Sequence, residues 1–266
     1  MLKSFFNGRN NKLVDSESYI RTPLELSYRS SGPFVTEVPP SSYRSGLLGL
    51  RIADNPFFRT LSQNQREYSD SDLYRYYQAV QPASAGDVMP VRDSRIASMP
   101  AMAACMPWWK ITPEERLKQV LASATDGRFL GKEAVKLGAD PETDYGWLYF
   151  GPVSENVGIT EFNRQWKVYE SIRKKGFQPT SSFSIHGEFL ISDSDWAWVN
   201  YGGKHRFVAL AAMGHQKIVV SAKNKYGPAF VRPEDVRAWP NVMNGWFTEE
   251  EALAVFWQMM SGRSTR

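Results

Sequence analysis

The chain has 266 residues, 42% of them hydrophobic and 23% charged, which is enough apolar material to bury a sizeable core. The net charge is +4, and 32 lysines and arginines are scattered among 28 acidic residues, without the basic stripe typical of a dedicated DNA-binding protein. The single cysteine, Cys105, excludes an internal disulfide and a zinc site of the Cys₂His₂ type. Neither a secretory signal peptide nor a run of about 18 apolar residues is visible, so the sequence predicts a cytoplasmic protein without a membrane span.

The first third of the chain has few signals of regular structure. Residues 1–60 are rich in Ser, Arg, Gly and Pro, and they predict an irregular arm that wraps around the rest of the protein. A short helix is predicted over 71–80, and one further helical turn over 83–88. Two adjacent tryptophans, Trp108 and Trp109, either stack on a base or sugar or pack against the domain that follows.

The middle of the chain starts with a strong helix signal. Thr112-Pro113-Glu114-Glu115 supplies a cap, a proline at the first helical position and acids in the first turn, so a helix is predicted over 112–124. A second short helix is expected over 132–137 and a strand over 145–153. A longer helix is predicted over 160–175, capped by the threonine at its first position. Its apolar face is formed by Phe162, Trp166, Tyr169 and Ile172.

The next segment alternates strands with one helix. A strand is predicted over 182–185, and two more, over 189–191 and 197–201, form a hairpin. An alanine-rich helix follows over 204–213, and a valine-rich strand over 217–220.

In the tail, Pro233 is a candidate helix start. The last helix begins at Thr248, which is spaced from Glu251 as in a capping box.

The stretch Gly202-Gly203-Lys204-His205-Arg206 carries the clearest chemical signal. Two glycines let the backbone approach a ligand closely, and the helix that follows offers free N–H groups and a partial positive charge. Lys204 adds a point charge, Arg206 a forked donor, and His205 either orients a phosphate or shuttles a proton. This order is typical of phosphate-binding turns. The alternative is a glycine turn before a helix whose cations are merely solvated.

The order of elements around this loop resembles the ParB/sulfiredoxin-like superfamily over roughly residues 145–221. The resemblance rests on Gly176-Phe177-Gln178-Pro179 before the strands, on Gly-Gly-Lys-His-Arg entering the alanine-rich helix, and on Gly214 before a short valine-rich strand. Sulfiredoxins carry Gly-Gly-Cys-His-Arg at the same place. The resemblance implies a nucleotide site in which this loop grips the phosphates, with ATP or CTP as the ligand.

Three departures narrow what the resemblance implies. Lys204 stands where sulfiredoxins have their reactive cysteine, so sulfinic acid reduction is not expected. ParB-like kinases tend to carry an acidic residue ahead of the glycine, and Gly202 occupies that position here. The helix-turn-helix region of DNA-partitioning ParB proteins is not visible after residue 220.

Because Gly202 stands where ParB-like kinases carry their acidic residue, a catalytic carboxylate would have to come from another part of this chain. Glu188, at the start of a predicted strand, is the best available base, although the favoured interpretation of this residue is a solvated strand-end acid. Asp193 and Asp195 are expected to be turn residues. Glu161, in the first turn of its predicted helix, either offsets the helix dipole or faces the phosphates.

The other two histidines carry weaker signals. His215 follows a predicted helix end, where a structural role is expected, and His186 shows no clear pattern. The spacings of the three histidines fit no standard zinc site, so no metal ligands are assigned.

These observations predict an α+β fold, with a small mixed sheet of the ParB/sulfiredoxin-like type, packed helices, an irregular N-terminal arm and a C-terminal helix. The expected division places an N-terminal arm and helical extension in residues 1–105, the ParB/sulfiredoxin-like domain in 106–225 and a C-terminal helical extension in 226–266.

The loop and the resemblance together predict a nucleotide-binding protein. It would use ATP, or CTP, with Mg²⁺ to transfer a phosphoryl group to a small-molecule or sugar acceptor. Residues 239–256 and 68–82 also resemble uncharacterised bacterial proteins found with surface-polysaccharide genes, which implies a sugar acceptor. The predicted catalytic residues are His205 and Glu188, and the predicted nucleotide-binding residues are Gly202, Gly203, Lys204, His205 and Arg206. The alternatives are a ParB-type nucleotide-gated DNA-binding or nuclease-like protein and a non-catalytic interaction protein.

Overall fold

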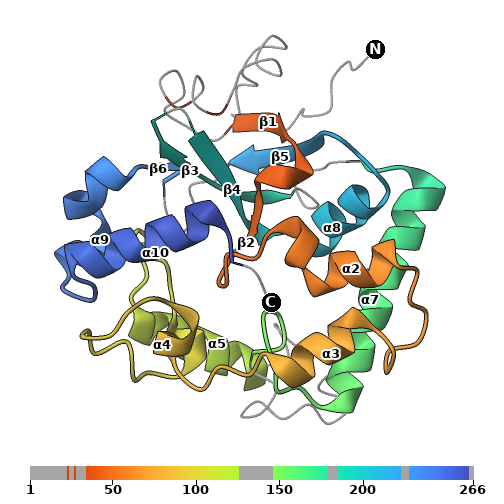
Figure 1. Ribbon diagram of the computed structural model, residues 1–266, viewed down its shortest axis with the longest axis horizontal. Helices are drawn as coiled ribbons and strands as arrows, with labels where there is room; N and C mark the ends of the chain where they lie inside the picture. The colour runs from red at the N-terminus through yellow and green to blue at the C-terminus, as the bar shows by residue number, and fades with distance from the viewer. Residues whose placement is uncertain are drawn as a thin grey trace.

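The computed structural model describes residues 23, 27, 34–125, 146–178, 185–193, 195–222 and 228–263. The helix predicted over 132–137 and most of the strand predicted over 182–185 lie outside these residues. The described fold is a mixed α+β arrangement with helices packed around one sheet (Figure 1). The broad fold class predicted from the sequence is therefore confirmed.

Among the described residues, the sheet has six strands and mixes parallel with antiparallel pairs. The strands are β1 (Phe34–Val38), β2 (Tyr43–Ser45), β3 (His186–Ser192), β4 (Asp195–Gly202), β5 (Ile218–Ala222) and β6 (Phe230–Val231). Their order is β1-β5-β3-β4-β2, with β6 beside β3. The pairs β1–β5 and β3–β4 are antiparallel, whereas β2–β4, β3–β5 and β3–β6 are parallel.

Strands β3 and β4 form the hairpin that the sequence predicts, and this hairpin lies at the centre of the sheet. Phe189 pairs with Trp198, and the next residue on each strand points to the opposite face, so the hairpin separates two apolar clusters. Asp193 in the connection has a φ of +48°, a conformation that aspartate tolerates, which confirms its expected role as a turn residue.

The expectation that residues 1–60 have little regular structure is wrong for residues 34–60. β1 pairs along its whole length with β5, and β2 pairs in parallel with β4. Helix α2 (Pro56–Ser62) follows, with Asn55 capping its first amides. Strands this short contain too few residues for a clear alternating pattern, so the Ser- and Pro-rich composition masks them. The strands of the sheet come from all three regions of the expected division, residues 1–105, 106–225 and 226–266.

The other helices follow the predicted order closely. They are α3 (Asp72–Ala79), α4 (Ala85–Val88), α5 (Pro113–Thr125), α7 (Glu155–Lys175), α8 (Lys204–Ala212), α9 (Pro240–Met243) and α10 (Glu249–Ser261), with short 3₁₀ segments at Pro40–Ser42, Ile52–Asp54, Ala101–Ala103 and Pro233–Ala238. The capping box of Thr248 and Glu251 at the start of α10 is confirmed. In Figure 1, α7 runs along one side of the molecule and α10 lies on the other. No described helix has the length and apolar composition needed to cross a membrane.

Two local predictions are wrong between residues 146 and 160. Helix α7 begins at Glu155 after Ser154, so Thr160 lies inside it and donates its hydroxyl to the carbonyl of Asn156. The strand expected over 145–153 is a turn followed by a cis Gly151–Pro152 peptide.

Tyrosine hydroxyls from α3 explain why this aromatic segment is not a strand. Tyr76 donates to the carbonyl of Tyr149 at 2.6 Å, and Tyr77 donates to that of Trp147 at 2.7 Å. These side chains satisfy backbone acceptors that a neighbouring strand would otherwise bond. The turn is thereby held next to the start of α8.

Candidate functional site

The site is built where β4 ends and α8 begins, in the strand–turn–helix order that the sequence predicts. Gly203 has a φ of +73°, the left-handed conformation that glycine adopts without steric cost. Gly202 is required for a different reason, because a Cβ atom there would lie 2.0 Å from the imidazole ring of His186. Both glycines of the motif are therefore needed for this turn.

The first turn of α8 presents amides that the fold leaves available. The carbonyl of Gly203 accepts hydrogen bonds from the amides of Arg206 and Phe207 at 3.0 and 3.1 Å. For the amides of Lys204 and His205, no acceptor is found in the described part of the chain. Free N–H groups at a helix start carry a partial positive charge and suit an anionic ligand.

Lys204 turns its side chain inward from the first position of α8. Its ammonium group donates to the carbonyl of Leu148 at 2.7 Å and lies 5.0 Å from the ring centre of Phe57. The rings of Trp147 and Tyr149 lie 5.7 and 5.8 Å away. Burial lowers the pKa of Lys204 to about 8, although Glu161 nearby opposes this shift.

His205, the next residue, faces a buried carboxylate on α7. Its Nε2 lies 3.2 Å from Oε2 of Glu161, whose side chain is 1% exposed, and Arg164 pairs with the other carboxylate oxygen. Burial alone would raise the pKa of Glu161, but His205, Lys204 and Arg164 lower it below its ordinary value. Burial lowers the pKa of His205, and Glu161 only partly offsets this. The imidazole is therefore neutral at neutral pH.

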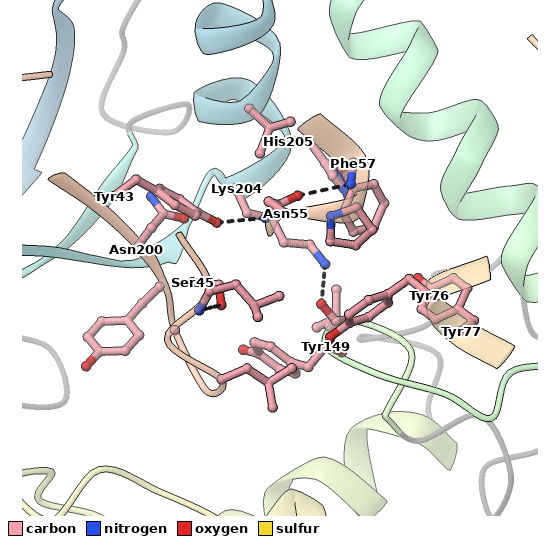
Figure 2. Close-up of a pocket in the computed structure, with 17 residues that line it drawn as sticks. Tyr43, Ser45, Asn55, Phe57, Tyr76, Tyr77, Tyr149, Asn200, Lys204 and His205 are labelled. Carbon is pink, nitrogen blue, oxygen red and sulfur yellow. Dashed lines mark hydrogen bonds between the residues drawn. The ribbon is translucent and has the colours of Figure 1, made fainter. Parts of the chain in front are cut away.

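A cavity of about 40 Å³ lies in front of Lys204, and Figure 2 shows the ammonium group pointing into it. His205 also lines the cavity. The rest of the lining combines aromatic rings with amide and hydroxyl groups, chiefly those of Tyr43, Tyr76, Tyr149, Asn55, Asn200 and Ser45. The amide oxygen Oδ1 of Asn200 is buried, and the described residues offer it no hydrogen-bond partner.

Two of the predicted site residues lie away from this cavity. Glu188 is buried on β3, where the indole N–H of Trp108 and the hydroxyl of Tyr201 both donate to its Oε1. Burial raises the pKa of Glu188 to about 8, and the two donors only partly oppose it. Arg206 is partly buried on α8, outside the cavity lining. Glu188 and Arg206 are thus not brought together with Lys204 and His205.

The remaining histidines contribute little to the site. His186 packs beneath Gly202, and His215 is exposed after Gly214 at the end of α8. Within the described residues, no cluster of three or more His, Cys, Asp or Glu side chains is placed to hold a metal ion.

Several residues of the site were not identified from the sequence. Tyr43 and Asn55 come from the segment expected to be an irregular arm, and Leu148 and Tyr149 from the segment expected to be a strand. Only Asn55 has a usable signal, because an asparagine directly before a proline is a good helix start.

Comparisons with known proteins do not add to this picture. No family model, curated protein or solved structure matches the chain.

Proposed function

We propose that this protein binds the phosphate end of a nucleotide, ATP or CTP, at the start of α8 and transfers a phosphoryl group to a hydroxyl of a small-molecule or sugar acceptor. One observation carries the proposal. The amides of Lys204 and His205, for which the described residues provide no acceptor, and the ammonium group of Lys204 belong to a single helix start that borders a cavity.

The charges around the cavity favour an anion. Lys204 and Arg164 are cations, Glu161 is the carboxylate between them, and His205 is neutral, so the group carries an excess positive charge. A buried excess charge is costly, and a phosphate oxygen would offset it. The α8 dipole adds to the attraction.

The size of the cavity limits what enters it. A water molecule needs roughly 10–15 Å³ of such space, so about 40 Å³ admits roughly three water-sized groups. That space suits a terminal phosphate rather than a whole nucleoside, which would extend outside the cavity.

The residues present do not form a protein-held Mg²⁺ site. The described residues that line the cavity include no aspartate or glutamate, and the nearby Glu161 is engaged by Arg164 and His205. Mg²⁺ usually takes one or two carboxylates in addition to phosphate oxygens. We therefore assign no step of the transfer to a metal.

Calorimetric titration with ATP, CTP and inorganic pyrophosphate tests the proposal. We expect the wild type to bind at least one of the three, and Lys204→Met to weaken that binding by roughly 10- to 100-fold, the usual effect of losing a hydrogen bond to a charged group. The matched control is Lys217→Met, since the Lys217 side chain is 72% exposed and remote in the fold. Failure of the wild type to bind any of the three, or equal binding by Lys204→Met, would contradict the proposal.

A further inference from the structure

The sequence favours Glu188 as the base that removes a proton from the acceptor hydroxyl, whereas the geometry at α8 favours His205. We infer that His205 is the general base of the proposed phosphoryl transfer and that Glu161 is its positioning residue. The inference rests on the proposed function. His205 thereby takes the role of base that the sequence assigns to Glu188. Glu188 is buried beside Trp108 and Tyr201 and does not line the cavity.

Two contacts orient the imidazole of His205. Its Nε2 lies 3.2 Å from Glu161, and its ring stands edge-on to Phe57 with centres 5.2 Å apart. Gln165 holds the backbone of the same residue by donating to its carbonyl at 3.1 Å. Glu161 is itself held, because Arg164 occupies its other oxygen. A base oriented by a carboxylate that is oriented in turn is the arrangement expected of a working nucleophile–base pair.

The contact with Glu161 also bears on which nitrogen is basic. Nε2 of His205 and Oε2 of Glu161 lie 3.2 Å apart, and among the described residues neither atom completes a hydrogen bond. Because a carboxylate only accepts hydrogen bonds, we place the hydrogen on Nε2, where it can be donated to Glu161, and leave the lone pair on Nδ1. The charged groups around the ring are Glu161 and Arg164 from α7 and Lys204 from α8, whereas α2 contributes the ring of Phe57 and α3 the hydroxyl-bearing Tyr77 in the cavity lining. Burial keeps the imidazole neutral and thus able to accept a proton.

The step balances as follows. The acceptor oxygen forms a bond to the terminal phosphorus while the bond from that phosphorus to the leaving nucleoside diphosphate breaks, and the diphosphate takes the electron pair. The acceptor proton passes to Nδ1 of His205. The resulting imidazolium is stabilised by Glu161 and then releases the proton to solvent.

The test compares wild type, Glu161→Gln and the control Glu170→Gln, which changes an exposed ion pair on the same helix. ATP is the nucleotide and water the acceptor, and release of phosphate is measured across pH alongside calorimetric ATP binding. We expect Glu161→Gln to keep ATP binding, to lower turnover by about 10²-fold, and to move the rising limb of the pH profile to lower pH, because Glu161 raises the pKa of His205. If Glu161 had only a structural role, Glu161→Gln would not shift the rising limb of the pH profile.

The outcomes separate the inference from the function on which it rests. If the wild type binds neither ATP nor pyrophosphate, the proposed function fails. If it binds ATP without turnover, or if Glu161→Gln has the wild-type rate and profile, the base assignment fails. If Glu161→Gln does not fold, ¹⁵N NMR of the wild-type histidines tests the inference instead, because it shows which ring nitrogen of His205 carries the hydrogen. The chain has 3 histidines, so His205 is readily assigned, and a hydrogen on Nδ1 rather than Nε2 would overturn the inference.

Discussion

Glu161 and Glu188 are both almost fully buried, and their surroundings affect them in opposite ways. Glu161 lies among Arg164, His205 and Lys204, so these neighbours hold its pKa down. In the described part of the chain, the contacts that shift Glu188 are the neutral donors of Trp108 and Tyr201, so burial dominates and raises its pKa to about 8. A glutamate in an apolar strand sequence gives no sign of which environment it will meet. The sequence favoured Glu188 as the base, whereas Glu161 is the glutamate that contacts His205 in the structure.

The raised pKa of Glu188 predicts a pH-dependent stability. Between its ordinary value of 4.5 and about 8, the unfolded chain releases this proton while the folded protein keeps it, so stability falls as pH rises through that window. Glu188→Gln removes the titration but keeps an oxygen acceptor. We expect the free energy of unfolding of Glu188→Gln, relative to wild type, to rise by roughly 2–4 kcal/mol from the acidic to the alkaline end of the window. Urea unfolding at several pH values measures it, and a constant difference would contradict it.

At the scale of elements, α10 is held at both ends by side chains from distant segments. At its start, Oε1 of Glu251 accepts the amides of Arg92, Asp93 and Ser94, each at 3.1 Å. At its end, Arg44 donates to the carbonyl of Met260 at 2.7 Å. Both contacts satisfy backbone groups that would otherwise lack partners, so α10 closes the fold over one face of the sheet.

Removing the Glu251 carboxylate should therefore destabilise the protein. We expect Glu251→Ala to lower the free energy of unfolding by roughly 1–3 kcal/mol, because the three amides lose a charged acceptor. The effect should shrink as pH falls, since the folded pKa of Glu251 is depressed and its stabilisation is present only while the group is ionised. Glu250→Ala, on the exposed side of the same turn, is the control, and an equal loss in both variants would contradict the role of Glu251.

Elements with strong local signals are the ones that the sequence predicted. The hairpin of β3 and β4, the cap of α10 and the turn at Gly202-Gly203 all follow from nearby residues. The short β2 and β6 have too few residues to show a pattern, and the turn at 146–150 depends on hydroxyls of α3 more than sixty residues earlier. The aromatic composition of residues 146–150, taken alone, predicts a strand.

For the whole molecule, the sheet joins segments that the sequence placed in three separate regions. Phe34 on β1 stacks on Phe230 on β6, with ring centres 5.2 Å apart, and lies 5.9 Å from Phe189 on β3. Each of these strands comes from a different region, so none of the three keeps its apolar surface covered without the others.

This shared core predicts that the chain unfolds in one cooperative step. In urea, tryptophan fluorescence and far-ultraviolet circular dichroism should give coincident transitions, because helices occur in all three regions. The tryptophans lie in the second and third regions, and the indole of Trp166 also reports on the first, because it donates to the carbonyl of Gln65. Phe34→Ala should lower the single midpoint, at a cost of roughly 3–5 kcal/mol. Two separate transitions would show that the three regions fold independently.

The central claim is that phosphate binds at the start of α8, and backbone amide NMR tests it most directly because it needs no substitution. During titration of the wild type with ATP, and separately with pyrophosphate, the amide signals of Lys204 and His205 should shift more than those of other assigned residues. They should do so at the concentrations at which binding is seen by calorimetry. Saturable binding that leaves these two amides unmoved, or no binding at all, would contradict the account.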